Sequence, residues 1–190
     1  TDYLDCLLVH WPNDKPPFSP VRLPGGPPLA ETLDAMNELV EAGLVRHIGV
    51  SNFDIGLLDE ARRLSDAPIF ANQVQFHPYW DQRRLLGYCR RNDVLLTAYS
   101  PLCHGGVLDD DVLGRIGRRY DKTPAQVAIR WAIQHEGVCA IPKATSRAHL
   151  AANIDVFDFG LTEAEMERIR RPSKLRTLAG FARSRLPFDV

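Results

Sequence analysis

The sequence of 190 residues has no marked excess of charge of one sign, since 23 basic and 24 acidic residues give a formal net charge of −1. A chain without a strong overall field is not drawn to nucleic acid or to an anionic membrane surface. No apolar run approaches the roughly 20 residues that cross a bilayer, and no signal peptide is evident. We therefore expect a cytoplasmic protein with neither a nucleic-acid nor a membrane partner.

Cysteine is scarce, and the four cysteines show no spacing typical of a disulfide framework or of a zinc site. Cys6 and Cys139 lie within apolar, strand-like runs, where cysteine behaves as a small hydrophobic residue. This usage favours a reducing compartment. The histidines also lack the spacing of metal ligands, so we expect no metal site.

The chain is short for the class of fold that its pattern suggests. A mass of 21.4 kDa allows one sizeable core, but 190 residues fall below the roughly 250 of a complete (β/α)8 barrel. The sequence starts at Thr1 without an initiator methionine and enters an apolar strand almost at once. We expect it to be a piece of a longer protein.

Five short apolar runs, each ending in polar or ring-bearing residues, alternate with helical patterns. We expect buried strands at 4–9, 45–50, 69–76, 94–98 and 138–141. This rhythm is typical of a parallel β/α barrel, whose chemistry lies at the carboxyl ends of its strands. Only five of the eight expected β/α units are present. An open, doubly wound parallel sheet is the alternative, and it too would place a ligand at the strand ends.

Helices are predicted from apolar stripes and from residues suited to capping, and the Pro/Gly-rich stretch from Pro12 to Pro28 is predicted as a loop. The expected helices are 29–42, Asp54 to about Leu64, Asp81 to Arg91, a short one ending near Tyr120, one opening at Thr123-Pro124, Ser146 to about Ile154, and Thr162 to about Arg170. Residues 1–171 are predicted as a partial barrel, and 172–190 as a tail.

Five motifs stand at the ends of the predicted strands: Leu-Leu-Val-His-Trp-Pro at 7–12, Gly-Val-Ser-Asn-Phe at 49–53, Asn-Gln-Val-Gln-Phe-His-Pro at 72–78, Ala-Tyr-Ser-Pro-Leu at 98–102 and Ala-Ile-Pro-Lys at 140–143. In this order they resemble the aldo-keto reductase family, particularly its small bacterial members acting on aldehydes and keto sugars. The resemblance runs from about Leu4 to Ile169.

The resemblance implies an α/β fold, a parallel (β/α)8 TIM barrel, of which this chain would hold strands 4 to 8, a C-terminal helix and a tail. It also implies an extended NADPH bound without a Rossmann motif, and no Gly-x-Gly-x-x-Gly occurs here. His10 matches the family's active-site histidine, and Trp11 matches a substrate-pocket residue. A neutral imidazole at that place can orient and polarise a substrate carbonyl by donating a hydrogen bond.

The cofactor contacts implied by the resemblance come from four of the motifs and the helix after the last one. The carboxamide of the nicotinamide would be held by Ser51, Asn52 and Gln73, its ring by Tyr99, the pyrophosphate by Ser100 and Leu102, and the adenosine by Lys143, His149 and Asn153. Each of these residues has an alternative role that involves no ligand. Asn52 and Gln73 would otherwise cap loops, Tyr99 would pack in the core, Lys143 would be a solvated surface lysine, and His10 would be structural.

Two positions depart from the family pattern and bear on the choice of cofactor. Ala144 stands where a serine or threonine is usual, and His149 stands where an arginine for the 2′-phosphate is usual. A histidine, mostly neutral at pH 7, recognises phosphate less well than a guanidinium does. Arg147 is close enough in sequence to substitute. NADP(H) is therefore preferred, and NAD(H) stays open.

The resemblance implies that the complete protein reduces an aldehyde or ketone to an alcohol with NADPH, acting on a small-molecule carbonyl and as a monomer. The family's catalytic aspartate, tyrosine and lysine belong to its first three β/α units and have no counterpart here, so we expect little activity from residues 1–190 alone. The tail would border the substrate pocket. Two alternatives stay open: a non-catalytic module that binds a nicotinamide nucleotide for regulation, and an inactive truncated fragment.

Overall fold

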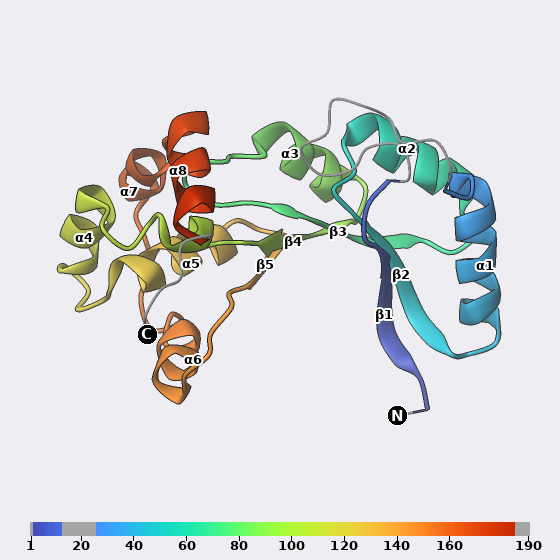
Figure 1. Cartoon of the computed structure of the whole chain (residues 1–190), viewed down its shortest axis with the longest axis horizontal. Helices are drawn as coiled ribbons and strands as arrows, with labels where there is room; N and C mark the ends of the chain where they lie inside the picture. The colour runs from blue at the N-terminus through green and yellow to red at the C-terminus, as the bar shows by residue number, and fades with distance from the viewer. Residues whose placement is uncertain (1, 13–25, 185–190) are drawn as a thin grey trace. The chain divides into compact units, whose positions relative to one another are not determined.

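The structure is a computed structural model that describes residues 2–12 and 26–184 (Figure 1). The described residues form two compact units. The first takes in the chain up to Val74 together with 84–97, and the second takes in 75–83 together with the chain from Ala98 onward. Most of the predicted loop from Pro12 to Pro28 lies outside the described residues, as does the end of the predicted tail.

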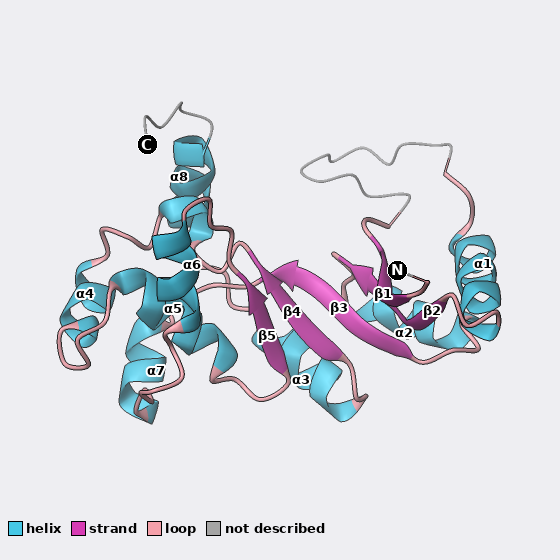
Figure 2. Ribbon diagram, turned by 90° about the horizontal axis from the view of Figure 1, so that it is seen from below, coloured by secondary structure: helices cyan, strands magenta, loops and turns pink. Residues whose placement is uncertain are grey.

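Five strands alternate with helices along the chain (Figure 2). They form a parallel sheet in the order β1-β2-β3-β4-β5, with bounds β1 Leu4–Val9, β2 Val45–Ser51, β3 Ile69–Gln75, β4 Leu95–Tyr99 and β5 Val138–Ile141. All five predicted strands are confirmed to within about one residue. A doubly wound sheet reverses its strand order partway, whereas this order follows the sequence. The sheet is consistent with a β/α barrel and does not favour the doubly wound alternative.

The burial predicted for the first strand is wrong. The first half of β1 is exposed, with Leu4 at 47% and Cys6 also exposed, and the second half is only partly buried. The reason is its place in the sheet, since among the described strands β1 pairs with β2 alone. Cys139, on β5 at the other edge, is only half-buried as well. Apolar composition predicted these two strands, but the number of neighbours decides their burial.

In the first unit, helix α1 (Leu29–Glu41) packs on β2 and on α2 (Ile55–Leu64), and α3 (Arg83–Arg91) precedes β4. Asp54 caps α2 as predicted, because its carboxylate accepts a hydrogen bond from the Leu57 amide at 3.0 Å. Gly49 lies where β2 passes close to β3. A β-carbon there would come within 2.6 Å of the Ala71 carbonyl oxygen, so this position requires glycine.

The second unit is built from η1 (Cys103–Gly105), α4 (Asp111–Gly117), α5 (Pro124–Ile133), α6 (Arg147–Ile154), α7 (Glu163–Ile169) and α8 (Lys174–Ser184). The predicted caps at Thr123, Ser146 and Thr162 are confirmed, and Thr162 also forms a capping box with Glu165. A second capping box joins Thr123 and Gln126. In the described part of the chain, no helix is both long and apolar enough to cross a membrane.

The capping role predicted for Asp81 is wrong. Helix α3 begins two residues later, and the Asp81 carboxylate, which is almost fully buried, accepts a hydrogen bond from Arg170 at 3.0 Å. An ion pair between residues this far apart in sequence arises from tertiary packing, so the sequence around Asp81 cannot predict it. Asp81 therefore fastens the turn before α3 to the end of α7.

The predicted tail from residue 172 contains a helix, α8. Just before it, the Ser173 amide donates to the Tyr79 carbonyl at 2.9 Å, and the Arg171 amide donates to the Pro78 carbonyl at 2.8 Å. The side chains of Arg171 and Arg176 both reach Oδ2 of Asp110, at 2.6 and 2.7 Å. The segment is thus fastened to the second unit by backbone and charged contacts.

Asp110 is the centre of this fastening. Its side chain is 1% exposed, caps α4 through the amides of Val112 and Leu113, and also accepts a hydrogen bond from the Tyr79 hydroxyl at 2.5 Å. Burial alone would raise the pKa of this carboxyl, but its hydrogen bonds from Tyr79, Arg171 and Leu113 and the charge of Arg171 hold the pKa well below the ordinary value. The carboxylate is therefore charged at every physiological pH.

His77 lies in the turn after β3 and is fully buried. Its Nδ1 accepts a hydrogen bond from the Tyr79 amide at 3.2 Å, and its Nε2 lies 3.0 Å from the Gln75 side-chain amide. Burial lowers the pKa of His77 to about 3, with a smaller contribution from His104, so the imidazole is neutral at pH 7. These contacts give His77 a structural role in the turn after β3.

We expect His77 to make the protein lose stability as the pH falls. The unfolded histidine takes up a proton below its ordinary pKa of 6.5, but the folded one does so only near 3, so the unfolded state binds more protons between these values. Between pH 7 and pH 5 the free energy of unfolding should fall by about 2 kcal/mol more in the wild type than in His77→Asn, whose amide oxygen can replace Nδ1. Urea unfolding at both pH values measures this difference, and equal falls would refute it.

Candidate active site

In the first unit, the end of β1 and the loop after β2 are joined by one side chain. Asn52 Nδ2 donates to the His10 carbonyl oxygen at 3.0 Å and to Ser51 Oγ at 3.0 Å. Asn52 has a φ of +64°, in the left-handed region that asparagine tolerates better than most residues. The predicted catalytic histidine and two of the predicted carboxamide contacts are therefore parts of one hydrogen-bonded arrangement.

Gln73, near the end of β3, completes this arrangement through its backbone. Its carbonyl oxygen accepts from Ser51 Oγ at 2.8 Å and from the Asn52 amide at 2.9 Å. The Gln73 side chain is half-buried and makes no hydrogen bond within the part of the chain that the structure describes. A glutamine amide can donate and accept at once, which is what recognition of a carboxamide needs.

Ser51 and Asn52 differ from Gln73 in what they offer a ligand. Ser51 is 1% exposed, and its hydroxyl both donates to Gln73 and accepts from Asn52. Both Asn52 Nδ2 bonds run to protein groups as well. The loop-capping role weighed for Asn52 in the sequence is therefore present in the structure. Of the three predicted carboxamide contacts, Gln73 has the side chain that is not engaged within the described protein.

His10 and Trp11 follow β1 directly, at its carboxyl end. The His10 side chain is exposed and Trp11 is half-buried, with ring centroids 6.1 Å apart and planes inclined by 48°. The His10 backbone is held by Asn52, whereas its imidazole projects where a ligand can reach it. An accessible ring N–H at the end of a parallel strand suits a group that donates to a substrate oxygen.

In the second unit, β4 ends at Tyr99 and leads into the loop with Ser100 and Leu102. All three residues are half-buried, and burial raises the pKa of the Tyr99 phenol. Ser100 has a φ of +48°, and its carbonyl oxygen accepts from the Cys103 amide at 2.8 Å, which closes a tight turn. This loop holds three of the predicted cofactor contacts next to one another.

The remaining predicted contacts lie at the end of β5 and on α6. Lys143 and His149 are exposed, and Lys143 forms no ion pair with any described residue. The first turn of α6 carries no acidic residue, and the Ser146 hydroxyl accepts from the His149 amide at 3.1 Å. Asn153 is half-buried and borders an apolar hollow of about 270 Å³ between α5, α6 and β5.

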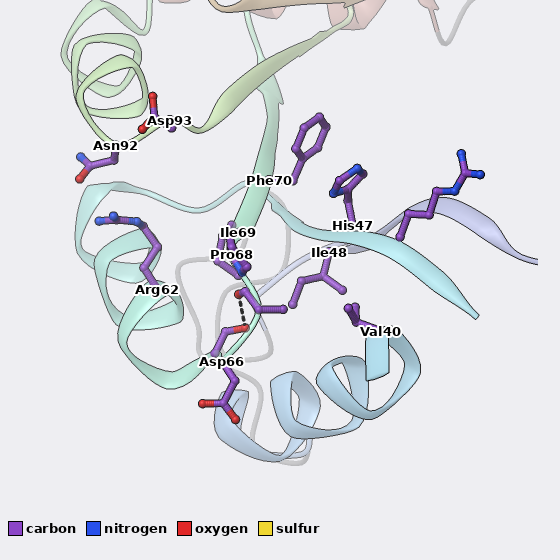
Figure 3. A pocket seen from close by; sticks show the side chains of 13 residues that line it. Val40, His47, Ile48, Arg62, Asp66, Pro68, Ile69, Phe70, Asn92 and Asp93 are labelled. Carbon is purple, nitrogen blue, oxygen red and sulfur yellow. Dashed lines mark hydrogen bonds between the residues drawn. The ribbon is translucent and has the colours of Figure 1, made fainter. Parts of the chain in front are cut away.

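A larger hollow, of about 540 Å³, lies in the first unit at the amino ends of β2 and β3 (Figure 3). His47 and Phe70 stack beside it, with ring centroids 4.5 Å apart. It lies at the opposite end of β2 from Ser51, and it contains none of the predicted site residues. Among the described residues, no group of three or more histidines, cysteines or acidic residues is arranged to hold a metal ion.

The structure adds two polar residues near the predicted contacts that sequence reasoning did not select. Asn72 is fully buried beside Gln73 and donates to the Phe53 carbonyl at 2.9 Å, while its Oδ1 has no partner among the described residues. His104 lies in the loop after β4, with Nε2 3.3 Å from Ser100 Oγ. Asn72 is the first residue of the 72–78 motif, whereas the only sequence signal for His104 is its nearness to Ser100.

These features define an α/β protein in which each unit carries polar and aromatic residues at the carboxyl ends of parallel strands, where such folds bind their ligands. The model of the aldo/keto reductase family matches residues 1–173. The chain belongs to this family, and the resemblance drawn from its motifs is confirmed.

Individual relatives agree with this assignment. The chain is 38% identical over 182 residues to a 9,11-endoperoxide prostaglandin H2 reductase of Trypanosoma cruzi, covering 94% of this chain and 60% of that protein. It is 38% identical over 168 residues to a glyoxal reductase of Bacillus subtilis, and the match covers 88% of this chain and 56% of that protein. The crystal structure of the thermostable aldo-keto reductase Tm1743 with the inhibitor epalrestat superposes on this chain with a TM-score of 0.78 at 40% identity. The superposition covers 90% of this chain and 60% of that protein.

The chain spans little more than half the length of these relatives, between 56% and 60%. Their names describe the activity of longer proteins. The family assignment therefore concerns this chain, and the activities in those names belong to the longer proteins.

Proposed function

We propose that the protein to which this sequence belongs reduces an aldehyde or ketone to the corresponding alcohol, with NADPH as its preferred cofactor. The observation that carries this proposal is the Asn52 bridge, which ties the backbone of His10 to Ser51 and, through the Gln73 carbonyl, to β3. Through this bridge, the candidate carbonyl-orienting histidine and the candidate carboxamide-binding glutamine belong to one hydrogen-bonded arrangement.

His10 would act on the substrate, with Trp11 beside it in the substrate pocket. A ring N–H that donates to the carbonyl oxygen orients the substrate and stabilises the negative charge that develops on that oxygen during reduction. Because Asn52 fixes the backbone of His10 at the strand end, the imidazole starts from a defined position. The reduced nicotinamide would supply the hydride.

By their chemistry, the residues of each unit suit different parts of a nicotinamide dinucleotide. The Gln73 amide matches the carboxamide, the half-buried Tyr99 offers a ring face, and Ser100 and Leu102 would meet the pyrophosphate. The adenosine end would meet the exposed Lys143 in the loop after β5, together with Arg147, His149 and Asn153 on α6. The preference for NADP(H) over NAD(H) rests on these cations, which suit a 2′-phosphate.

The proton donor has no counterpart in this sequence. The aspartate, tyrosine and lysine that the resemblance implies would belong to the part of the family barrel that this chain does not span, and the five strands would be strands 4 to 8 of that barrel. Residues 172–190 would border the substrate pocket. The proposal is therefore one for the whole protein, to which this chain contributes His10 and the cofactor contacts.

A binding and turnover experiment on the full-length protein tests the proposal. Quenching of tryptophan fluorescence gives the Kd of NADPH and of NADH, and the loss of reduced-nicotinamide absorbance with glyoxal as substrate gives turnover. We expect tighter binding of NADPH than of NADH, and turnover with NADPH. Gln73→Leu should weaken the binding of both cofactors by about tenfold, because both share the carboxamide and one hydrogen-bonding group to it is lost.

Each result has a clear alternative. Binding without turnover of glyoxal or of other aldehydes and ketones would favour a non-catalytic nicotinamide-binding module. Unchanged affinities in Gln73→Leu would remove that residue from the cofactor site. Failure of the wild type to bind either nucleotide would refute the proposal as a whole.

A further inference from the structure

The loop after β4 is held in an unfavourable backbone conformation. Ser100, Cys103 and His104 have φ values of +48°, +49° and +51°, in the left-handed region. Each non-glycine residue there costs about 1 kcal/mol or more. Such a conformation persists only where surrounding contacts hold it, so the neighbours of this loop must supply those contacts.

Two contacts hold the His104 side chain. Its Nε2 lies 3.3 Å from Ser100 Oγ, and its ring centroid lies 4.3 Å from that of Phe181 on α8, with planes inclined by 39°. The ring is half-buried between these two groups. His104 therefore connects a residue predicted to meet the cofactor with the C-terminal helix.

Helix α8, red in Figure 1, also packs directly on the backbone of the same loop. Gly180 is buried against Cys103, and a β-carbon at Gly180 would clash with the Cys103 carbonyl oxygen. The Cys103 thiol points to the Arg176 carbonyl oxygen at 3.9 Å. A glycine in the middle of a helix lowers helix stability, and here it allows the close approach.

We propose that His104 is a positioning residue for cofactor binding, and that α8 sets the affinity for NADPH by holding His104 through Phe181. The inference rests on the proposed function and deepens it. When Nε2–H of His104 donates to Ser100 Oγ, the Ser100 hydroxyl hydrogen is directed to a phosphate oxygen of the pyrophosphate. Without His104, the serine rotates and its hydrogen points elsewhere.

This arrangement makes the affinity for the cofactor depend on pH. Burial lowers the pKa of His104, so its imidazole is neutral at pH 7 without the cofactor. A bound pyrophosphate favours imidazolium, which raises the pKa of His104 in the complex. Binding then takes up a proton, and affinity for NADPH rises as the pH falls through the window between the two pKa values.

Among the described residues, His77, Cys103 and Tyr99 do not titrate in that window. His77 stays neutral, because burial, with a smaller electrostatic contribution from His104, lowers the pKa of His77 to about 3. Burial raises the pKa of the Cys103 thiol to about 11 and also raises that of the Tyr99 phenol. On α8, the Arg176 guanidinium is held by Asp110.

The test is the Kd of NADPH at pH 8 and at pH 6 in the full-length protein and its variants. His104→Ala should weaken binding by about tenfold at pH 6, the effect of losing one hydrogen bond to a charged site. His104→Gln keeps an N–H donor, so its affinity at pH 8 should stay within about threefold of the wild type. Its gain in affinity on going to pH 6 should be smaller than that of the wild type, because the charge is missing.

The role of α8 is tested by two substitutions on the same helix. Phe181→Ala should weaken NADPH binding by about three- to fivefold, because the His104 ring loses its partner. Leu178→Ala is the matched control, since Leu178 is 61% exposed and its loss should leave the Kd unchanged.

The outcomes separate this inference from the proposed function. If the wild type binds NADPH and His104→Ala binds it equally well, the proposed function holds and the inference is wrong. The inference is also wrong if His104→Gln keeps the full pH dependence. Equal affinities for Phe181→Ala and Leu178→Ala would refute the part assigned to α8, and a wild type that binds no NADPH would overturn both.

Discussion

Replacing Asp110 by alanine should lower the free energy of unfolding by about 3 to 5 kcal/mol, the loss typical when one partner of a buried ion pair is removed. The substitution leaves Arg171, Arg176 and the Tyr79 hydroxyl without their shared acceptor, and it removes the N-cap of α4. The guanidinium of Arg171 is only about one-third exposed, so water replaces the lost carboxylate poorly.

Two further variants separate the parts of this effect. Asp110→Asn keeps an oxygen that can accept from the α4 amides but removes the charge, so its loss of stability should be smaller than that of Asp110→Ala. Asp111→Ala is the matched control, because Asp111 is the exposed neighbour in the first turn of α4. Its effect should stay within about 0.5 kcal/mol. Urea unfolding followed by circular dichroism measures all three variants.

The acid side of the stability profile gives an independent check. The folded pKa of Asp110 is lowered, so the stabilisation is complete above the ordinary carboxyl pKa near 4 and is lost as the pH falls below it towards the folded value. Below pH 4 the wild type should therefore lose stability more steeply than Asp110→Asn. Parallel profiles for the two proteins, or a loss below about 1 kcal/mol in Asp110→Ala at pH 7, would contradict the role assigned to this carboxylate.

Local patterns explain most of what the sequence predicted correctly. The five strands were found from short apolar runs, and the caps at Asp54, Ser146 and Thr162 were found from chemistry that acts within three residues. These signals depend only on neighbours along the chain, so they predict local structure without knowledge of the fold.

The errors concern features that distant residues decide. Asp81 has the chemistry of a cap, but Arg170 binds it instead, 89 residues further along the chain. Helix α8 contains Gly180, whose presence weakens a helix prediction and whose reason is visible only against Cys103. The exposure of β1 follows from its single partner in the described sheet, which composition does not reveal.

In the candidate site, too, local motifs predicted some features, whereas contacts between distant residues decided others. Family motifs selected His10, Asn52 and Gln73, and the structure of the first unit brings these three together. That Asn52 would use its amide hydrogens on His10 and Ser51 could not be predicted, because it depends on a left-handed φ at an asparagine. His104 was missed because its importance lies in contacts with Ser100 and Phe181, which no spacing indicates.

In the full-length protein, His10→Ala should lower kcat/KM for an aldehyde by about 100-fold and change the Kd of NADPH by less than about twofold. The loss corresponds to removing one hydrogen-bond donor to an oxygen that gains negative charge, which typically costs roughly 10²- to 10³-fold in rate. Cofactor affinity should be kept because the contact between this position and the cofactor-binding residues runs through the backbone. Asn52 Nδ2 donates to the carbonyl oxygen of residue 10, which alanine retains.

Two comparisons make the His10 result specific. His10→Gln keeps a side-chain N–H and should recover part of the lost kcat/KM, which an effect on folding alone would not produce. His47→Ala is the matched control, since His47 lies on β2 near its amino end and stacks on Phe70, away from the His10–Asn52 arrangement. Its kcat/KM should equal that of the wild type. If His10→Ala instead loses NADPH affinity in the same proportion as kcat/KM, the histidine supports the cofactor site and does not orient the carbonyl.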